Sequence, residues 1–239
     1  MANENESILK LELYLARHGQ SQGNVGYEGC EPTEEDLWDP KLTALGQKQA
    51  DLLGKRFSEI PLDCVIASPY ARATATGYAV ASQQPENGSR TLELHPLFCE
   101  CGTGDPPGKT LEEIQINYPN VCLAPGAEGF EHLVYADKTN EDVERIARGR
   151  RMIRYLTNRF QNGERVLVAA HACFNTFLIF AALGLPATPP FDFSNGNTGL
   201  TKILFYEAGS GRYGDTVLVY HNDQSHLYLP FKGVQLDET

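Results

Sequence analysis

The sequence predicts a three-layer α/β/α sandwich with a mostly parallel central sheet. Segments typical of buried strands alternate with segments typical of helices, a pattern of crossover-connected parallel strands. Several strand segments are short, bounded apolar runs, of which 166–170 (VLVAA) is the clearest. With 239 residues, 41% of them hydrophobic, the chain is long enough for a sizeable core. We therefore expect residues 1–239 to form one domain.

In the first half of the chain, glycines, prolines and apolar spacing mark the element boundaries. Leucines at 42, 45, 52 and 53 fall near one helical face, and Lys55 and Arg56 follow in the last turn, where cations are favoured. Segment 70–82 is rich in alanine and starts after a proline. The expected elements are a strand at 10–16, a loop at 19–40, a helix at 42–57, a strand at 64–67, a helix at 70–82 and a short strand at 92–94.

Between about residues 99 and 138 the apolar periodicity fades, and Gly and Pro become frequent. We expect a lid-like insertion here, with a short helix at 111–117 and with Tyr118, Phe130 and Tyr135 as candidate pocket residues. A capped, amphipathic helix should begin after Asn140 and end before Gly163. The remaining expected elements are a strand at 165–170, a helix at 174–183 and strands at 199–206 and 216–220.

Composition excludes several classes of protein. The net charge of −11, with no cluster of basic residues, argues against a nucleic-acid groove. No apolar run is long enough to span a bilayer, and residues 1–7 lack a signal-peptide core, which predicts a cytoplasmic protein without membrane partners. The six cysteines are expected to be free thiols. Cys99-Glu100-Cys101 lacks the paired C-x-x-C spacing of structural zinc sites, so no metal is predicted.

Residues that suit phosphoryl chemistry follow the ends of the predicted strands. Arg17 and His18 follow the first strand, Arg72 lies shortly after the second, and His171 directly follows 166–170. Glu100 comes after the weak strand at 92–94. Since ligand sites of open α/β sheets lie at the carboxyl ends of the strands, these side chains can meet at one edge.

This set of residue types can transfer a phosphoryl group. Two guanidinium groups and a protonated histidine would neutralise the charge on the transferring group. A second histidine with a free ring nitrogen could attack phosphorus and hold it as phosphohistidine. A nearby carboxylic acid could protonate the leaving alkoxide and then, as carboxylate, activate water.

Three motifs, in this order, resemble the histidine phosphatase superfamily, also called phosphoglycerate mutase-like. They are Arg17-His18-Gly19 with Asn24 six positions after the histidine, then Ser68-Pro69-Tyr70-Ala71-Arg72-Ala73, then His171 after its apolar strand. The resemblance implies a phosphoglycerate mutase-like fold and a phosphatase that needs no cofactor. It implies that His18 is the nucleophile, that Arg17, Arg72 and His171 bind the phosphoryl group, and that Asn24 and Ser21 add hydrogen bonds.

The resemblance also implies a glutamate proton donor after the second arginine motif. We assign it to Glu100, because a glycine often follows that glutamate by four residues in the family and Gly104 fits only Glu100; Glu93 is the alternative. The expected activity is hydrolysis of a small phosphomonoester. A phosphoglycerate mutase is the main alternative, although segment 101–138 carries only Lys109 and Lys138 as cations. A non-catalytic phospho-ligand binder is a further alternative.

Segment 102–110 (GTGDPPGKT) also resembles a P-loop, which would make the protein an NTPase. However, the glycine that the motif requires five places before Gly108 is replaced by Thr103, and two prolines without N–H groups fall inside the loop. The P-loop is therefore the weaker interpretation.

Overall fold

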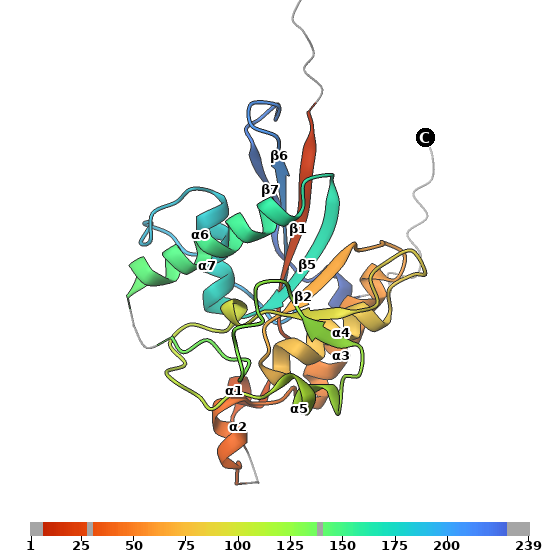
Figure 1. The fold of residues 1–239 in the computed structure, drawn as a ribbon, viewed down its shortest axis with the longest axis vertical. Coiled ribbons are helices and arrows are strands. Elements are labelled where there is room, and N and C mark those ends of the chain that lie inside the picture. Colours follow the sequence, from red (N-terminus) through yellow and green to blue (C-terminus); the bar gives the residue numbers. More distant parts are fainter. Residues whose placement is uncertain (1–6, 28–30, 138–140, 229–239) are drawn as a thin grey trace, which may run out of the picture.

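A seven-stranded sheet forms the centre of the computed structural model, which describes residues 7–27, 31–137 and 141–228 (Figure 1). The strands are β1 (Leu9–Arg17), β2 (Cys64–Ala67), β3 (Leu92–Leu94), β4 (Val121–Leu123), β5 (Glu164–Ala170), β6 (Leu200–Tyr206) and β7 (Thr216–Asp223). Their order in the sheet is β4-β3-β2-β5-β1-β6-β7. Neighbours from β4 to β1 pair in parallel, and β6 and β7 add an antiparallel edge.

Helices cover both faces of this sheet. They are α1 (Gln22–Val25), α2 (Glu34–Trp38), α3 (Ala44–Phe57), α4 (Ala71–Ser82), α5 (Leu111–Gln115), α6 (Asp142–Arg159) and α7 (Ala172–Ala182), with short 3₁₀ turns at Pro96–Phe98 and Ser225–Tyr228. In Figure 1, α6 and α7 lie together, and α3 and α4 form a second pair beside β2. The predicted three-layer, mostly parallel architecture is confirmed.

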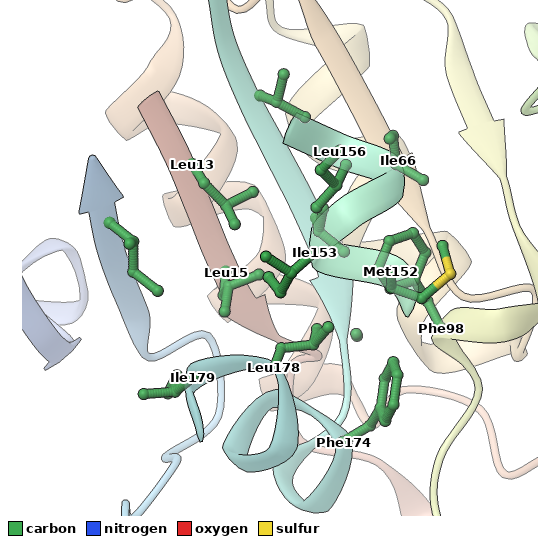
Figure 2. Packing of buried hydrophobic residues seen from close by; sticks show 14 of the residues in the cluster. Leu13, Leu15, Ile66, Phe98, Met152, Ile153, Leu156, Phe174, Leu178 and Ile179 are labelled. Atoms are coloured by element: carbon green, nitrogen blue, oxygen red, sulfur yellow. The ribbon is translucent and has the colours of Figure 1, made fainter. Parts of the chain in front are cut away.

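Side chains that point alternately to the two faces of the central strands form two hydrophobic cores, one on each face of the sheet. Leu13 and Leu15 of β1 belong to the cluster that contains the apolar faces of α6 and α7, whereas Tyr14 and Ala16 belong to the cluster under α3 and α4. Figure 2 shows Ile153 and Leu156 of α6 and Leu178 of α7 packed beside Leu13 and Leu15. Since each fully buried leucine contributes about 2 kcal/mol, the two cores fix β1 and β5 firmly at the centre of the sheet.

Several short elements differ from the sequence prediction. Helices α1 and α2 lie within the expected loop at 19–40, and β4 lies within the expected insertion, where it pairs with β3 at the sheet edge. Helix α2 depends on a local cap: the Thr33 hydroxyl accepts a hydrogen bond from the Asp36 N–H, and the Asp36 carboxylate accepts one from the Thr33 N–H. α1 and α2 are too short for helical periodicity to reveal, and β4 lies in a segment whose frequent Gly and Pro obscure the pattern of a strand. The predicted cap Asn140 lies outside the described residues.

Two other expectations concern the whole chain. Within the described residues, Cys64, Cys99, Cys101, Cys122 and Cys173 are free thiols, as predicted, whereas Cys30 lies outside them. In the same part of the chain, no helix combines the length and the apolar character needed to cross a bilayer.

The start of α3 packs unusually close to the loop that follows His18. A Cβ atom on Gly46 would lie 1.9 Å from the carbonyl oxygen of Gln20. Gly46→Ala is therefore expected to destabilise the protein by about 2–3 kcal/mol through overpacking, despite the better helix propensity of alanine. Thermal or urea unfolding measures this effect. Gly129→Ala is the matched control, because a Cβ atom there meets nothing within 4 Å; equal stability of the two variants would contradict the prediction.

Candidate active site

The two histidines meet because their strands are neighbours in register. Arg17 at the end of β1 pairs with Ala170 at the end of β5, and the backbone N–H of His18 donates to the Ala170 carbonyl at 2.9 Å. His18 and His171 therefore leave the sheet side by side, with ring centroids 5.3 Å apart. The end of β2 lies on the other side of β5 and brings Ser68 to the same edge, where its N–H donates to the Ala169 carbonyl.

His18 has the geometry of a neutral nucleophile. Its Nδ1 lies 2.7 Å from the Gly19 carbonyl oxygen, which can only accept a hydrogen bond, so Nδ1 carries the proton. Nε2 then carries the lone pair of the ring, which accepts a hydrogen bond from Arg72 Nε at 3.3 Å. Burial, followed by the charge of Arg72, lowers the pKa of His18 well below its ordinary value. The residue is 3% exposed, and the lowered pKa favours the neutral ring.

Three residues near His18 carry buried hydrogen-bond donors that have no hydrogen-bond partner in the described part of the chain. These donors are Nε of Arg17, Nη1 of Arg72 and, when it carries the ring proton, Nδ1 of His171. Arg17 is fixed by Nη1, which donates to the Asn195 carbonyl at 2.8 Å. His171 is fixed by a 2.7 Å hydrogen bond between its Nε2 and the Ser68 hydroxyl. Since buried polar groups normally have partners, these atoms form a site suited to an anion.

The charge of His171 differs from the sequence expectation of a protonated ring. His171 is completely buried, and burial together with the charge of Arg72 lowers its pKa well below the ordinary value. In the free protein the ring is therefore neutral, and the two arginines carry the positive charge of the site. A neutral His171 can still donate a hydrogen bond from one ring nitrogen.

Glu100 lies at the N-terminus of α7, where three backbone N–H groups hold its carboxylate. Oε1 accepts from Cys101 at 2.8 Å and from Phe174 at 3.0 Å, and Oε2 accepts from Cys173 at 3.3 Å. Helix N-termini favour negative charge. Burial lowers the pKa of Arg17, and the charge of the nearby Glu100 opposes this. The Glu100 carboxyl group therefore lies beside the residues around His18.

Glu93, the alternative proton donor, has a different environment. Both of its oxygens bind the guanidinium of Arg159 on α6, at 2.5 and 2.6 Å. Its neighbours also include the thiols of Cys64 and Cys122, and none of its contacts involves His18 or an arginine of the site. The geometry therefore favours Glu100.

Ser21 and Asn24 shape the loop after His18. The side-chain oxygen of Asn24 accepts from the Ser21 N–H at 3.1 Å and from Asn197 Nδ2 at 3.2 Å. Asn197 Nδ2 also lies 3.1 Å from the His18 carbonyl oxygen, to which it donates. Ser21 is buried and Asn24 is exposed. Both residues thus belong to the loop next to His18, and the amide N–H₂ of Asn24 is the group that could reach a ligand.

Sequence reasoning missed several positioning residues. Ser68 was visible as the residue after a strand, but its bond to His171 depends on the register between β2 and β5. Asn195 and Asn197 come from a loop more than 170 positions after His18, which no local pattern can reveal.

Asp39 is a further positioning residue that the sequence did not reveal. It is 1% exposed, its Oδ1 accepts a hydrogen bond from the Ala71 N–H at 2.7 Å, and the same oxygen lies 3.8 Å from Arg72 Nη1. Burial raises the pKa of Asp39, while Lys109 and Arg72 oppose the increase.

The P-loop interpretation does not agree with the structure. Between β3 and segment 102–110 lies the 3₁₀ turn Pro96–Phe98, so the segment does not directly follow a strand, and the helix after it, α5, has only five residues. The Lys109 ammonium lies 2.6 Å from Glu35 Oε1 and 3.4 Å from Asp39 Oδ2, so carboxylates already neutralise its charge. Lys109 thus connects the segment at 99–138 to the buried carboxylate of Asp39, which lies beside Arg72.

Two cavities flank the residues around His18. One, of about 620 Å³, is lined by Cys173 and Asn195 and by the aromatic rings of Phe177, Phe180, Phe191 and Phe193. The other, of about 500 Å³, is lined by Pro69, Ala71, Lys109 and Tyr118. Of the three aromatic residues proposed from the sequence as pocket residues, Tyr118 lines a cavity, whereas Phe130 and Tyr135 pack against the core clusters.

Buried histidines should make the protein sensitive to acid. Burial, followed by the charge of Arg151, lowers the pKa of His95 to about 4. Below pH 6.5 the unfolded chain binds a proton at this residue while the folded protein does not, so acidification favours unfolding. Between pH 7 and pH 5.5 we expect His95 alone to reduce the free energy of unfolding by about 1 kcal/mol.

Urea unfolding at the two pH values measures this effect. His95→Asn is the informative variant, because asparagine can still accept the hydrogen bond that His95 Nδ1 accepts from the Leu97 N–H but does not titrate. Its loss of stability between pH 7 and 5.5 should be about 1 kcal/mol smaller than that of the wild type. The same loss in both proteins would contradict the lowered pKa.

Known proteins with similar sequences include a phosphatase and a probable mutase. Phosphoserine phosphatase 1 of Hydrogenobacter thermophilus is 33% identical over 113 residues, which cover 46% of this chain and 47% of that protein. This match therefore spans about half of each protein. Probable phosphoglycerate mutase GpmB of Escherichia coli is 25% identical over 226 residues, which cover 92% of this chain and 96% of that protein.

Solved structures of phosphatases are also similar to this chain. Phosphoserine phosphatase from Entamoeba histolytica, in complex with 3-phosphoglyceric acid, superimposes with a TM-score of 0.60 at 25% identity and covers 91% of this chain and 99% of its own. A mycobacterial glucosyl-3-phosphoglycerate phosphatase in complex with VO₃ superimposes with a TM-score of 0.61 at 25% identity. The match covers 88% of this chain and 98% of that protein. The family model described as histidine phosphatase superfamily (branch 1) matches residues 13–214. The chain therefore belongs to the histidine phosphatase superfamily.

Proposed function

We propose that this protein hydrolyses small phosphomonoesters through a phosphohistidine on His18. The observation that carries the proposal is the Nε2 lone pair of His18, which accepts a hydrogen bond from Arg72 Nε and lies among residues whose buried donors have no partner within the described residues. Membership of the superfamily and the phosphatases among the similar proteins support a phosphatase-type enzyme. The phosphorylated small molecule bound to the Entamoeba protein supports a substrate of the same class.

In the first step, Nε2 of His18 attacks phosphorus and the bond to the leaving oxygen breaks. The Nδ1–H bond to the Gly19 carbonyl holds the ring and stabilises the positive charge that develops on it. Arg17, Arg72 and His171 donate to the phosphoryl oxygens, and Asn24 and Ser21 support the loop beside them. Glu100, in its protonated form, gives its proton to the leaving alkoxide.

In the second step, water replaces His18 on phosphorus. Glu100, now a carboxylate, takes a proton from the attacking water, the P–N bond breaks, and inorganic phosphate leaves. The two guanidinium groups supply the charge stabilisation throughout, so we expect hydrolysis to need no metal ion or other cofactor.

Phosphoglycerate mutase activity is the second candidate, because the similarity to the probable mutase covers almost the whole chain. A mutase must retain a phosphorylated product for return transfer, and that requires cations beyond the reacting phosphate. Segment 101–138 carries two lysines and no arginine, and Glu35 and Asp39 already neutralise one of these lysines, Lys109. The charge of this segment therefore favours hydrolysis.

Product analysis in the presence of EDTA tests the proposal. The substrates are an aryl phosphate, phosphoserine and 3-phosphoglycerate. Release of inorganic phosphate from any of them supports hydrolysis, and unchanged rates in EDTA support metal independence. Conversion of 3-phosphoglycerate to its 2-isomer without phosphate release would replace hydrolysis by mutase activity. Binding of all three without turnover would make the protein a phospho-ligand binder.

A further inference from the structure

Two thiols lie directly beside the carboxylate of Glu100. One ligand atom from each of Glu100, Cys101 and Cys173 can be chosen so that all three lie within 4.8 Å of one another. Cys101 follows Glu100 in the chain, whereas Cys173 comes from the first turn of α7, so the fold and not the local sequence makes this cluster. The proposed chemistry uses neither thiol.

We propose that Glu100, Cys101 and Cys173 form a binding site for a thiophilic divalent cation of the Zn²⁺ class. A tetrahedral zinc ion takes two sulfurs at about 2.3 Å and an oxygen at about 2.1 Å, which places the ligand atoms about 3.5–3.8 Å apart. The three side chains therefore need to approach one another by only about 1 Å. Thiolate ligands select zinc over Mg²⁺ or Ca²⁺.

The surroundings provide what such a site needs beyond its ligands. Arg148 is 6% exposed and its Nη2 donates to Cys101 Sγ at 3.2 Å, an outer partner that a metal-bound thiolate would keep. The Glu100 carboxylate accepts three backbone hydrogen bonds, which leaves one of its roughly four lone-pair positions for a cation. Two thiolates and a carboxylate around a dication leave a net charge of −1, which faces the Arg148 guanidinium favourably.

An ion can also reach the site. Cys173 lines the cavity of about 620 Å³, and Asp142 lines the same cavity. This opening gives an entry path and room for water as the fourth ligand. Binding would release the two thiol protons to solvent. It would also hold the oxygen of Glu100 that the proposed hydrolysis needs, so Zn²⁺ would inhibit the enzyme, and only this consequence rests on the proposed function.

Co²⁺ binding tests the site without any assay of activity. The reduced wild-type protein, titrated with Co²⁺, should bind one equivalent with a thiolate-to-cobalt charge-transfer band that Zn²⁺ then removes. Cys101→Ser and Cys173→Ser should each weaken Co²⁺ affinity at least about 100-fold, more than loss of an outer partner does. Cys122→Ser, a partly buried thiol on β4, is the matched control and should bind as the wild type does.

Three outcomes separate the possibilities. No charge-transfer band, or an equal band in Cys101→Ser, would overturn the site. A disulfide between Cys101 and Cys173 that persists after treatment with a reductant, seen as a loss of two titratable thiols, would overturn it as well. A band with unchanged hydrolysis in Zn²⁺ would confirm the site and contradict the role of Glu100 as proton donor, which distinguishes failure of the proposed function from failure of the metal site.

Discussion

Replacing His18 with asparagine is expected to lower kcat for every phosphomonoester by at least about four orders of magnitude. The reason is that, in the proposed mechanism, the Nε2 lone pair of His18, which accepts a hydrogen bond from Arg72 Nε, forms the covalent bond to phosphorus. Asparagine keeps a polar group near the Gly19 carbonyl but offers no nucleophilic lone pair on nitrogen. Steady-state hydrolysis of an aryl phosphate measures the effect.

His95→Asn is the control for this variant, because His95 is also 3% exposed but hydrogen-bonds to the Leu97 N–H, away from the site. It should retain wild-type activity. Should His18→Asn fold poorly, rapid quenching of the wild type with substrate in alkali gives an independent test, since phosphohistidine is stable to base. Mass spectrometry should then locate one phosphoryl group on the peptide that contains His18. Full activity of folded His18→Asn, or a phosphoryl group on another residue, would refute the nucleophile assignment.

The sequence predicted an element well where its apolar run or helical spacing is bounded by turn residues. β2 and β3 have the predicted bounds, and β5 begins one residue before the predicted strand. Helix α7 begins at Ala172, two residues before the prediction, because the polar contacts of Glu100 with its first turn replace a local capping signal. The edge strand β4 was missed, since three residues inside a Gly- and Pro-rich segment carry no detectable period.

The candidate site also contains some features that the sequence could predict and others that it could not. His18 and His171 could be predicted to meet, because each directly follows a strand of a parallel sheet. The contacts that hold them could not be predicted. The bond from His171 to Ser68 depends on the register of β2 against β5, and the bond from Asn197 to the His18 carbonyl joins segments 179 positions apart. Such contacts arise from tertiary packing and leave no spacing in the sequence.

Glu100→Gln should slow phosphorylation and dephosphorylation of His18 to different extents, and the difference should depend on the leaving group of the substrate. An alkyl phosphate needs a proton on its leaving oxygen, so phosphorylation of His18 should slow by about 10²–10⁴-fold. An aryl phosphate has a stable leaving group and should still phosphorylate His18 quickly. Dephosphorylation, which lacks its general base, should then limit turnover. The variant should therefore release a burst of about one phenol per enzyme before a slow steady state, which stopped-flow absorbance measures.

Glu93→Gln is the matched control, since it removes a carboxylate that pairs with Arg159 and leaves the residues around His18 intact. It should hydrolyse both substrates without a burst, as the wild type does. A purely structural role for Glu100, as the acceptor of the N–H groups of Cys173 and Phe174, makes a different prediction: both substrates would slow equally and no burst would appear. Dependence of the defect on the leaving group therefore decides whether Glu100 moves a proton or only holds the start of α7.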